Sequence, residues 1–213
     1  MTGWRGLIRL LASFALLSAV PANSAPAVAP LPVNIFGGDA GEAQVSDEGE
    51  VHHRATGFVY PRQLGDMPQR KVAIYGEADV SVDYTLRGGG NGDAWITFYV
   101  YPARITLDEE AAHIEHDIVE NWLAVRAERP SPAPASAPGA RSGWFTGARE
   151  NHRVTTGYVV VQRGLWFLMT RFSVPDEAAP DAFKRVDAAL DDVPWTWLPP
   201  AIQRPAGRVA SAF

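Results

Sequence analysis

The sequence predicts an α+β domain in which an antiparallel sheet of about six to seven strands is flanked by two main α-helices. Several segments alternate apolar and polar residues with a period of two, which is typical of strands with one buried face. Two other segments repeat apolar residues at intervals of three and four, which is typical of amphipathic helices. Because runs of strands are interrupted by so few helices, this order favours an α+β sandwich over a doubly wound parallel sheet.

The first predicted strands are residues 57–60 and 71–75. The clearest hairpin joins residues 80–86 to residues 94–101, because the turn-forming segment 87–93 lies between two alternating runs. The period of two in the first of these runs predicts that it buries one face and leaves the other in water.

A second hairpin joins residues 158–161 to residues 165–172. It is apolar on both faces, so we expect it to lie at the centre of the sheet with cover on each side. Trp166 belongs to this hairpin and Trp122 to the apolar stripe of the first helix. Both indoles are therefore expected in the core.

The first helix is predicted to begin at Thr106, because Thr106 and Glu109 match the Ser/Thr-x-x-Asp/Glu pattern of a capping box. Apolar residues then recur at three and four positions as far as Val125, so one face of this helix should be buried. The second helix, residues 181–193, carries a similar stripe and ends before Pro194, which cannot continue it.

One domain is predicted, spanning residues 51–198. Residues 26–50 are rich in proline, alanine, glycine and acidic side chains, and are predicted to form a loose N-terminal arm. Within the domain, residues 130–142 contain four prolines and are predicted to form a solvated loop. Residues 199–213 are predicted to form a flexible tail.

Residues 1–25 have the features of a secretory signal peptide. Arg5 and Arg9 precede the apolar run 10–20, which is followed by proline and small residues. An uncleaved membrane anchor is the alternative, but the run is shorter than the roughly 18–20 residues that a spanning helix needs. We therefore expect cleavage within residues 24–27. The mature protein would be periplasmic or secreted, and would not span the membrane.

Composition narrows the possible partners and chemistry. The 213 residues contain no cysteine, which excludes disulfides and thiol catalysis, and 46% of them are hydrophobic, enough for a sizeable core. The net charge is −5, and no basic stripe of the kind that nucleic-acid binding requires is present. Arginine strongly outnumbers lysine, which together with abundant alanine and proline indicates a bacterial, GC-rich genome.

Several hydrophobic segments occur in a characteristic order: 57–61, 98–102, 164–172 and a final helix that closes on Pro194 and Trp195. This layout resembles the PsbP-like fold, which is shared with the Ran-binding Mog proteins. The resemblance covers the whole predicted domain. It implies a binding or assembly factor, since members of that fold mostly act in this way, and it carries over no catalytic residue.

His113 and His116 are the candidate metal ligands, because residues three apart on a helix share a face. With Glu109, Asp117 and Glu120 nearby, two imidazoles and a carboxylate could bind zinc. The spacing fits neither His-Glu-x-x-His nor His-x-x-Glu-His, and both histidines oppose the apolar stripe. We therefore expect a solvated charged face, with no metal or other cofactor.

A second candidate site combines Arg141, Arg149 and Arg153 with Trp144, since arginine beside aromatic rings is common at recognition surfaces. On this hypothesis Trp144 is exposed and dispensable for folding. A strand with a solvated outer face is the simpler alternative for this cluster.

The sequence contains no nucleophile elbow and no phosphate-binding Walker sequence. It therefore favours a non-catalytic binding or assembly module, with an envelope protein or a small ligand as its partner. The alternative is a metal-dependent or other hydrolase that uses the His113 and His116 face.

Overall fold

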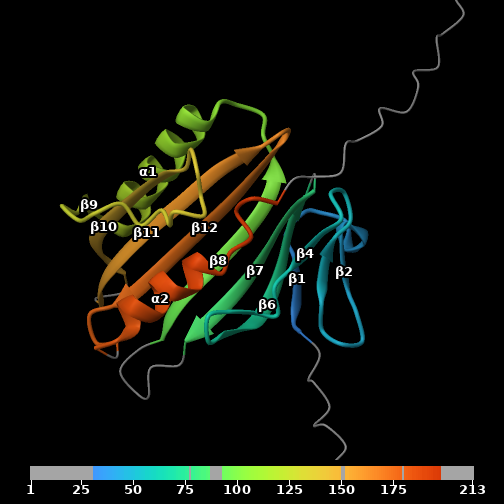
Figure 1. Ribbon diagram of the computed structural model, residues 1–213, viewed down its shortest axis with the longest axis horizontal. Coiled ribbons are helices and arrows are strands. Elements are labelled where there is room, and N and C mark those ends of the chain that lie inside the picture. The colour runs from blue at the N-terminus through green and yellow to red at the C-terminus, as the bar shows by residue number, and fades with distance from the viewer. Residues whose placement is uncertain (1–30, 77, 87–92, 150–151, 179, 198–213) are drawn as a thin grey trace, which may run out of the picture.

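The computed structural model describes residues 31–76, 78–86, 93–149, 152–178 and 180–197 (Figure 1). Their elements confirm the α+β class, since many strands are accompanied by two α-helices. The predicted signal peptide and C-terminal tail lie outside the described residues, as does most of the glycine-rich turn of the first hairpin. Neither α-helix in these ranges is both long and apolar enough to cross a membrane.

Within the described ranges, the main sheet has nine strands. Eight follow the order β1-β6-β7-β8-β12-β11-β10-β9, and the ninth, β5, pairs with β6 beside this path. The strands are β1 (Val33–Ile35), β5 (Gln63–Leu64), β6 (Met67–Gly76), β7 (Asp79–Leu86), β8 (Ala94–Pro102), β9 (Val125–Arg126), β10 (Arg141–Arg149), β11 (His152–Arg163) and β12 (Trp166–Pro175).

This sheet corrects the prediction of six to seven antiparallel strands, because it has nine and is mixed, with β1 parallel to β6. The strands β1, β5 and β9 have three, two and two residues. Segments this short cannot display a period of two, so no sequence pattern marks them. The hairpins β7–β8 and β11–β12 form as predicted, with Leu86 opposite Ala94 and Arg163 opposite Trp166.

A smaller sheet of three strands packs against the main one. Phe58 and Tyr60 place their rings 5.4 and 5.5 Å from the ring of Phe98, and the Tyr60 hydroxyl donates to the Val80 carbonyl at 2.6 Å. The predicted loose arm contributes to both sheets, since it contains β1, the short 3-10 helix η1 and β2. The elements are η1 (Ala40–Glu42), β2 (Ala43–Val45), β3 (Val51–His53) and β4 (Phe58–Tyr60).

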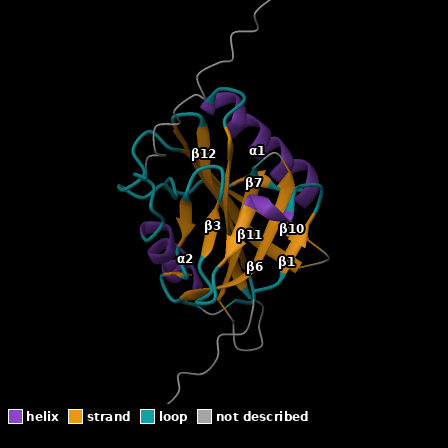
Figure 2. Cartoon of the chain, turned by 90° about the vertical axis from the view of Figure 1, so that its right-hand side faces the viewer, coloured by secondary structure: helices purple, strands orange, loops and turns teal. Residues whose placement is uncertain are grey.

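The helices α1 (Leu107–Trp122) and α2 (Ala182–Asp191) lie on opposite sides of the main sheet (Figure 2). The capping box of α1 forms as predicted: the Glu109 amide donates to Thr106 Oγ1, and the Thr106 amide donates to Glu109 Oε2. The helix ends at Trp122, earlier than predicted, because Leu123 takes a left-handed conformation with φ +46°.

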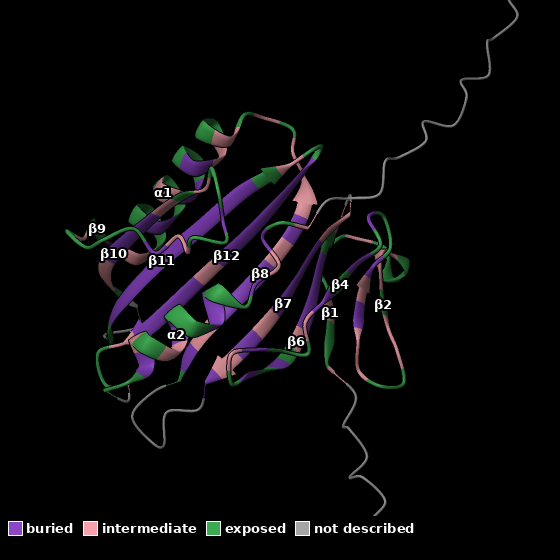
Figure 3. Ribbon diagram, viewed as in Figure 1, coloured by how far each residue is buried: buried purple, intermediate pink, exposed green. Residues whose placement is uncertain are grey.

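Each side of the main sheet has its own hydrophobic core. On the α2 side, α2 and the small sheet cover Phe98, Phe172 and Trp195. On the α1 side, Ile114 and Ile118 of the helix pack on rings of β10, β11 and β12. The strands β11 and β12 are buried along most of their length (Figure 3), which confirms the prediction of a central hairpin covered on both sides.

Two details of the predicted core need adjustment. Trp166 is 6% exposed, as expected, but Trp122 is only partly buried and lies 6.1 Å from the ring of Trp95. The segment predicted as a solvated loop also contributes to the core, because Ala137 is 4% exposed and packs on the α2 side. A proline-rich segment needs no hydrogen-bonded ladder of its own, so it can lie along an apolar surface.

Helix α1 covers only part of its side of the sheet. Its core contacts come from β8, β10, β11 and β12, whereas no side chain of β6 or β7 belongs to that core. Tyr75 on β6 is accordingly 44% exposed. We call this strip the open half of the α1 side. Tyr75 is exposed, Thr97 is buried and the others are partly buried; the residues are Lys71, Tyr75, Asp83, Trp95, Thr97, Tyr99 and Arg171.

Candidate functional site

A pocket of about 540 Å³ lies at one end of the open half, between the β6–β7 turn, the end of β8 and the start of α1. Two carboxyl side chains line it, Asp79 and Glu110. Two aromatic rings, Tyr75 and Tyr101, line it as well. We call it the Asp79 pocket.

Backbone forms one wall of this pocket, because two chain segments approach closely at glycines. Gly76 has φ +103°, and a Cβ atom added there would lie 3.1 Å from the Gly37 carbonyl oxygen. A Cβ atom added at Gly38 would lie 2.5 Å from an Ile74 methyl carbon and 2.7 Å from the Gly76 amide nitrogen. Only glycine fits at Gly38, and Gly37 and Gly76 line the pocket with backbone atoms alone.

A buried histidine holds the turn that presents Asp79. His53 Nε2 lies 2.8 Å from the Ala78 carbonyl oxygen, and Ala78 is in the left-handed region with φ +62°. Because a carbonyl can only accept, Nε2 must donate, and Nδ1 accepts from the Thr56 hydroxyl at 2.8 Å. Burial lowers the pKa of His53, which favours this neutral tautomer.

Asp79 differs from the other carboxyl group of the pocket in its hydrogen bonding. Its Oδ1 is buried and has no hydrogen-bond partner in the part of the chain that the structure describes. Burial, followed by the nearby charges of Glu110 and Glu42, raises the pKa of Asp79 to about 6. Glu110 differs, because its Oε1 accepts a hydrogen bond from the Tyr101 hydroxyl at 2.6 Å. A buried carboxyl without a donor costs stability, which a ligand donor would offset.

Aromatic rings surround these carboxyl groups. The Tyr75 ring stacks on Phe36, with centroids 5.3 Å apart, and lies 6.4 Å from Tyr99. The Tyr101 ring lies 5.5 Å from Phe167. Exposed Arg104 also lines the pocket. Carboxyl oxygens together with the faces of aromatic rings suit a positively charged group that donates hydrogen bonds.

The structure does not bring the predicted arginine and tryptophan cluster together. Trp144 is 6% exposed, so the prediction that it stands on a free surface is wrong. The alternation of β10 directs its ring to the α2 side, where the ring packs edge-on against Phe172 at 4.8 Å and lies 6.0 Å from Phe183. The Arg129 guanidinium lies over both Trp144 and Phe183.

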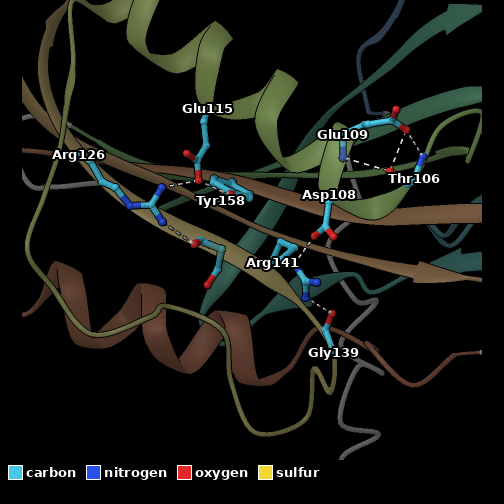
Figure 4. Close-up of polar contacts among 9 residues, drawn as sticks. Thr106, Asp108, Glu109, Glu115, Arg126, Gly139, Arg141 and Tyr158 are labelled. Carbon is cyan, nitrogen blue, oxygen red and sulfur yellow. Dashed lines mark hydrogen bonds and ion pairs between the residues drawn. The ribbon is translucent and has the colours of Figure 1, made fainter.

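Arg141 and Arg153 have separate partners, and Figure 4 shows the partner of Arg141. Arg141 Nε donates to Asp108 Oδ1 at 2.6 Å and so ties β10 to α1, on the side opposite Trp144. Arg153 is exposed and lies 3.3 Å from Asp176, while the side chain of Arg149 lies outside the described residues. Because Trp144 is buried, Arg141 and Arg153 form no common surface with it.

A second contact in Figure 4 also fixes α1. Glu115 Oε1 accepts hydrogen bonds from the Tyr158 hydroxyl at 2.7 Å and from the Arg126 guanidinium. These contacts join the helix to β11 and β9. Glu115, Tyr158 and Arg126 therefore help to hold α1 against the sheet.

His113 and His116 are both exposed on the outer face of α1, as the helical spacing predicts. Within the ranges that the structure describes, no three histidine, cysteine or acidic side chains are grouped to hold a metal ion. The two histidines also do not line the Asp79 pocket. The alternative hydrolase hypothesis therefore gains no geometric support.

The comparisons with known proteins give no match: no family model, curated protein or solved structure matches this chain significantly. Its function has to be inferred from the geometry of its own residues. The pocket residues Asp79, Glu110 and Tyr101 escaped the sequence analysis because they form no motif. The one available signal was an acid at the first position of a strand.

Proposed function

We propose that the protein is an exported, non-catalytic binding module that takes a positively charged ligand group into the Asp79 pocket. The observation that carries this proposal is Asp79 itself, whose Oδ1 is buried at the pocket without a donor among the described residues. The predicted signal peptide supports export to the periplasm or beyond. The resemblance to the PsbP-like fold supports binding or assembly in place of catalysis.

The size and chemistry of the pocket support a small organic cation or a single basic side chain. A volume of about 540 Å³ falls within the range of roughly 300–1,000 Å³ that is typical of ligand pockets. Ammonium and guanidinium groups carry only donors, which matches carboxyl acceptors.

Titration calorimetry with agmatine, and with pentanol as an uncharged comparison, tests the proposed ligand class. Agmatine should bind the wild-type protein, and pentanol should not. Asp79→Asn should abolish binding, whereas Asp83→Asn, which changes an acid on the same strand outside the pocket, should retain it. Equal binding of the two probes, or unchanged binding to Asp79→Asn, would overturn the proposal.

Export is tested separately by mass spectrometry of the protein isolated from its native cells. We expect an N-terminus created by cleavage within residues 24–27. A cytosolic protein that retains Met1 would contradict export and leave the ligand proposal standing.

A further inference from the structure

We propose a second binding site, in which Arg171 binds the carboxylate of an apolar organic acid on the open half of the α1 side. This site needs neither Asp79 nor Glu110, and it shares with the Asp79 pocket only the ring of Tyr75. It therefore stands or falls independently of the proposed function.

Arg171 lies in the middle of the open half of the α1 side. On β12 it lies directly opposite Thr97 of β8 and Tyr158 of β11. The hydroxyls of these neighbours donate elsewhere: that of Thr97 to Asp83 at 2.8 Å, and that of Tyr158 to Glu115 at 2.7 Å. In the described residues, neither hydroxyl oxygen accepts a hydrogen bond from the guanidinium.

The guanidinium has no partner of its own. Arg171 Nε is buried without an acceptor, and its side chain has no hydrogen bond or ion pair within the described ranges. The Asp117 carboxylate on α1 acts on it only through longer-range attraction. Burial lowers the pKa of Arg171 because the charged form loses hydration. A mostly buried arginine without an acceptor is costly, and a ligand anion would supply what is missing.

Aromatic rings determine which anion fits. Trp95 and Tyr99 stand two residues on either side of Thr97, so they are the diagonal neighbours of Arg171, at about 7–8 Å between strands. Each ring is continued by another: Trp95 lies 6.1 Å from Trp122, and Tyr99 lies 6.4 Å from Tyr75. These rings would pack against an apolar body, while the planar guanidinium holds a carboxylate through two parallel hydrogen bonds.

The nearby cation does not compete for the same anion. Lys71, at the far end of this polar row, already forms an ion pair with Asp83 at 3.1 Å. Arg171 is therefore the cation of this strip whose guanidinium lacks a hydrogen-bond acceptor among the described residues. Charge complementarity selects a carboxylate, and the flanking rings favour an acid with an aromatic or aliphatic body over a bare inorganic anion.

Nuclear magnetic resonance tests the site through the side-chain Nε–Hε signal of Arg171. Phenylacetate should shift this signal in a saturable way, and phenylacetamide, which has the same body without the charge, should bind at least about tenfold more weakly. The measurement on the wild-type protein depends on no variant. Equal affinity for acid and amide would overturn the proposal.

Variants provide the matched controls. Arg171→Gln should lose phenylacetate binding, while Arg153→Gln, which changes an exposed arginine on the neighbouring strand, should keep it. Asp117→Asn should tighten binding by about two- to fivefold, because it removes a like charge near the incoming carboxylate. Unchanged binding to Arg171→Gln would overturn the proposal.

A final comparison identifies the source of the acid. A short peptide that ends in phenylalanine is titrated with a free and with an amidated C-terminus. Tighter binding of the free peptide than of phenylacetate points to a polypeptide terminus, whereas weaker binding points to a free organic acid. Binding of the amidated peptide as tightly as the free one would contradict carboxylate recognition.

Discussion

The two sides of the main sheet differ in how completely they are covered. On the α2 side, the second helix and the small sheet leave Phe58, Tyr60 and Trp195 at most 1% exposed. On the α1 side, the first helix stops short of β6 and β7, and Tyr75 stays 44% exposed. One sheet thus carries a closed core on one side and an accessible strip on the other.

Their polar groups differ in the same way. On the α2 side, the Tyr60 hydroxyl donates to Val80 at 2.6 Å and the Trp195 indole donates to Leu190 at 2.8 Å. On the α1 side, neither the Asp79 nor the Arg171 side chain has a hydrogen bond or ion pair among the described residues. Unsatisfied charges lower stability and are retained where they bind something. The α2 side has unpartnered buried atoms as well, Trp166 Nε1 and Arg185 Nε, but both sites that we propose lie on the α1 side.

The largest expected effect is on the closed side. Trp144→Ala should lower the free energy of unfolding by about 3–5 kcal/mol, because a ring packed against Phe172 and Phe183 leaves a cavity. Urea unfolding followed by circular dichroism measures the loss. A loss below about 1 kcal/mol would place Trp144 on the surface, contrary to its burial.

The next effect depends on pH and comes from the open side. Asp79 has a folded pKa of about 6, above its ordinary value of 3.8, so the folded state favours the protonated form. Its contribution to stability is therefore full below about pH 4 and is lost as the pH rises through 6. Asp79→Asn should raise the free energy of unfolding by about 1–3 kcal/mol at pH 7.5 and leave it unchanged at pH 4.

Thermal and urea unfolding of the two proteins at both pH values checks this difference. Asp83→Asn serves as the control, since Asp83 is partnered by Lys71 and Thr97. A gain of equal size at both pH values would mean that the substitution acts through packing and not through the charge of Asp79.

The sequence predicted the long hairpins because their pattern is local. Val80, Val82 and Tyr84 alternate with polar residues, and all three are fully buried. It did not predict β1 or β9, whose pairing is decided by distant strands. It also misplaced Trp144, because apolar and polar residues do not alternate cleanly in β10, so that the pairing with β11 determines which side each residue faces.

The candidate sites were beyond sequence reasoning for a related reason. Asp79 and Glu110 come from separate elements and meet only through the order of the strands. Arg171 is a candidate because its guanidinium lacks a hydrogen-bond acceptor among the described residues. The sequence does not show whether a given side chain will find such an acceptor in the fold. His113 and His116, by contrast, were predicted to face solvent because helical spacing alone decides it.

A smaller effect is expected at Arg171. Arg171→Met should raise the free energy of unfolding by about 1–2 kcal/mol, because replacing a buried unpaired charge by an apolar side chain removes its desolvation cost. Urea unfolding at neutral pH measures the gain. A clear loss of stability would show that Arg171 has a structural acceptor and would weaken the contrast between the two sides.

The smallest effect is expected at Tyr75, the counterpart of Trp144 on the open side. Both are large aromatic residues on strands of one sheet, but Tyr75 is 44% exposed, and its ring contacts are with Phe36, itself 60% exposed, and with Tyr99. Tyr75→Ala should therefore cost less than about 1 kcal/mol. The same substitution should weaken agmatine binding, because it removes an aromatic wall of the Asp79 pocket. A loss of stability as large as that of Trp144→Ala would mean that the open half is a core and not a recognition surface.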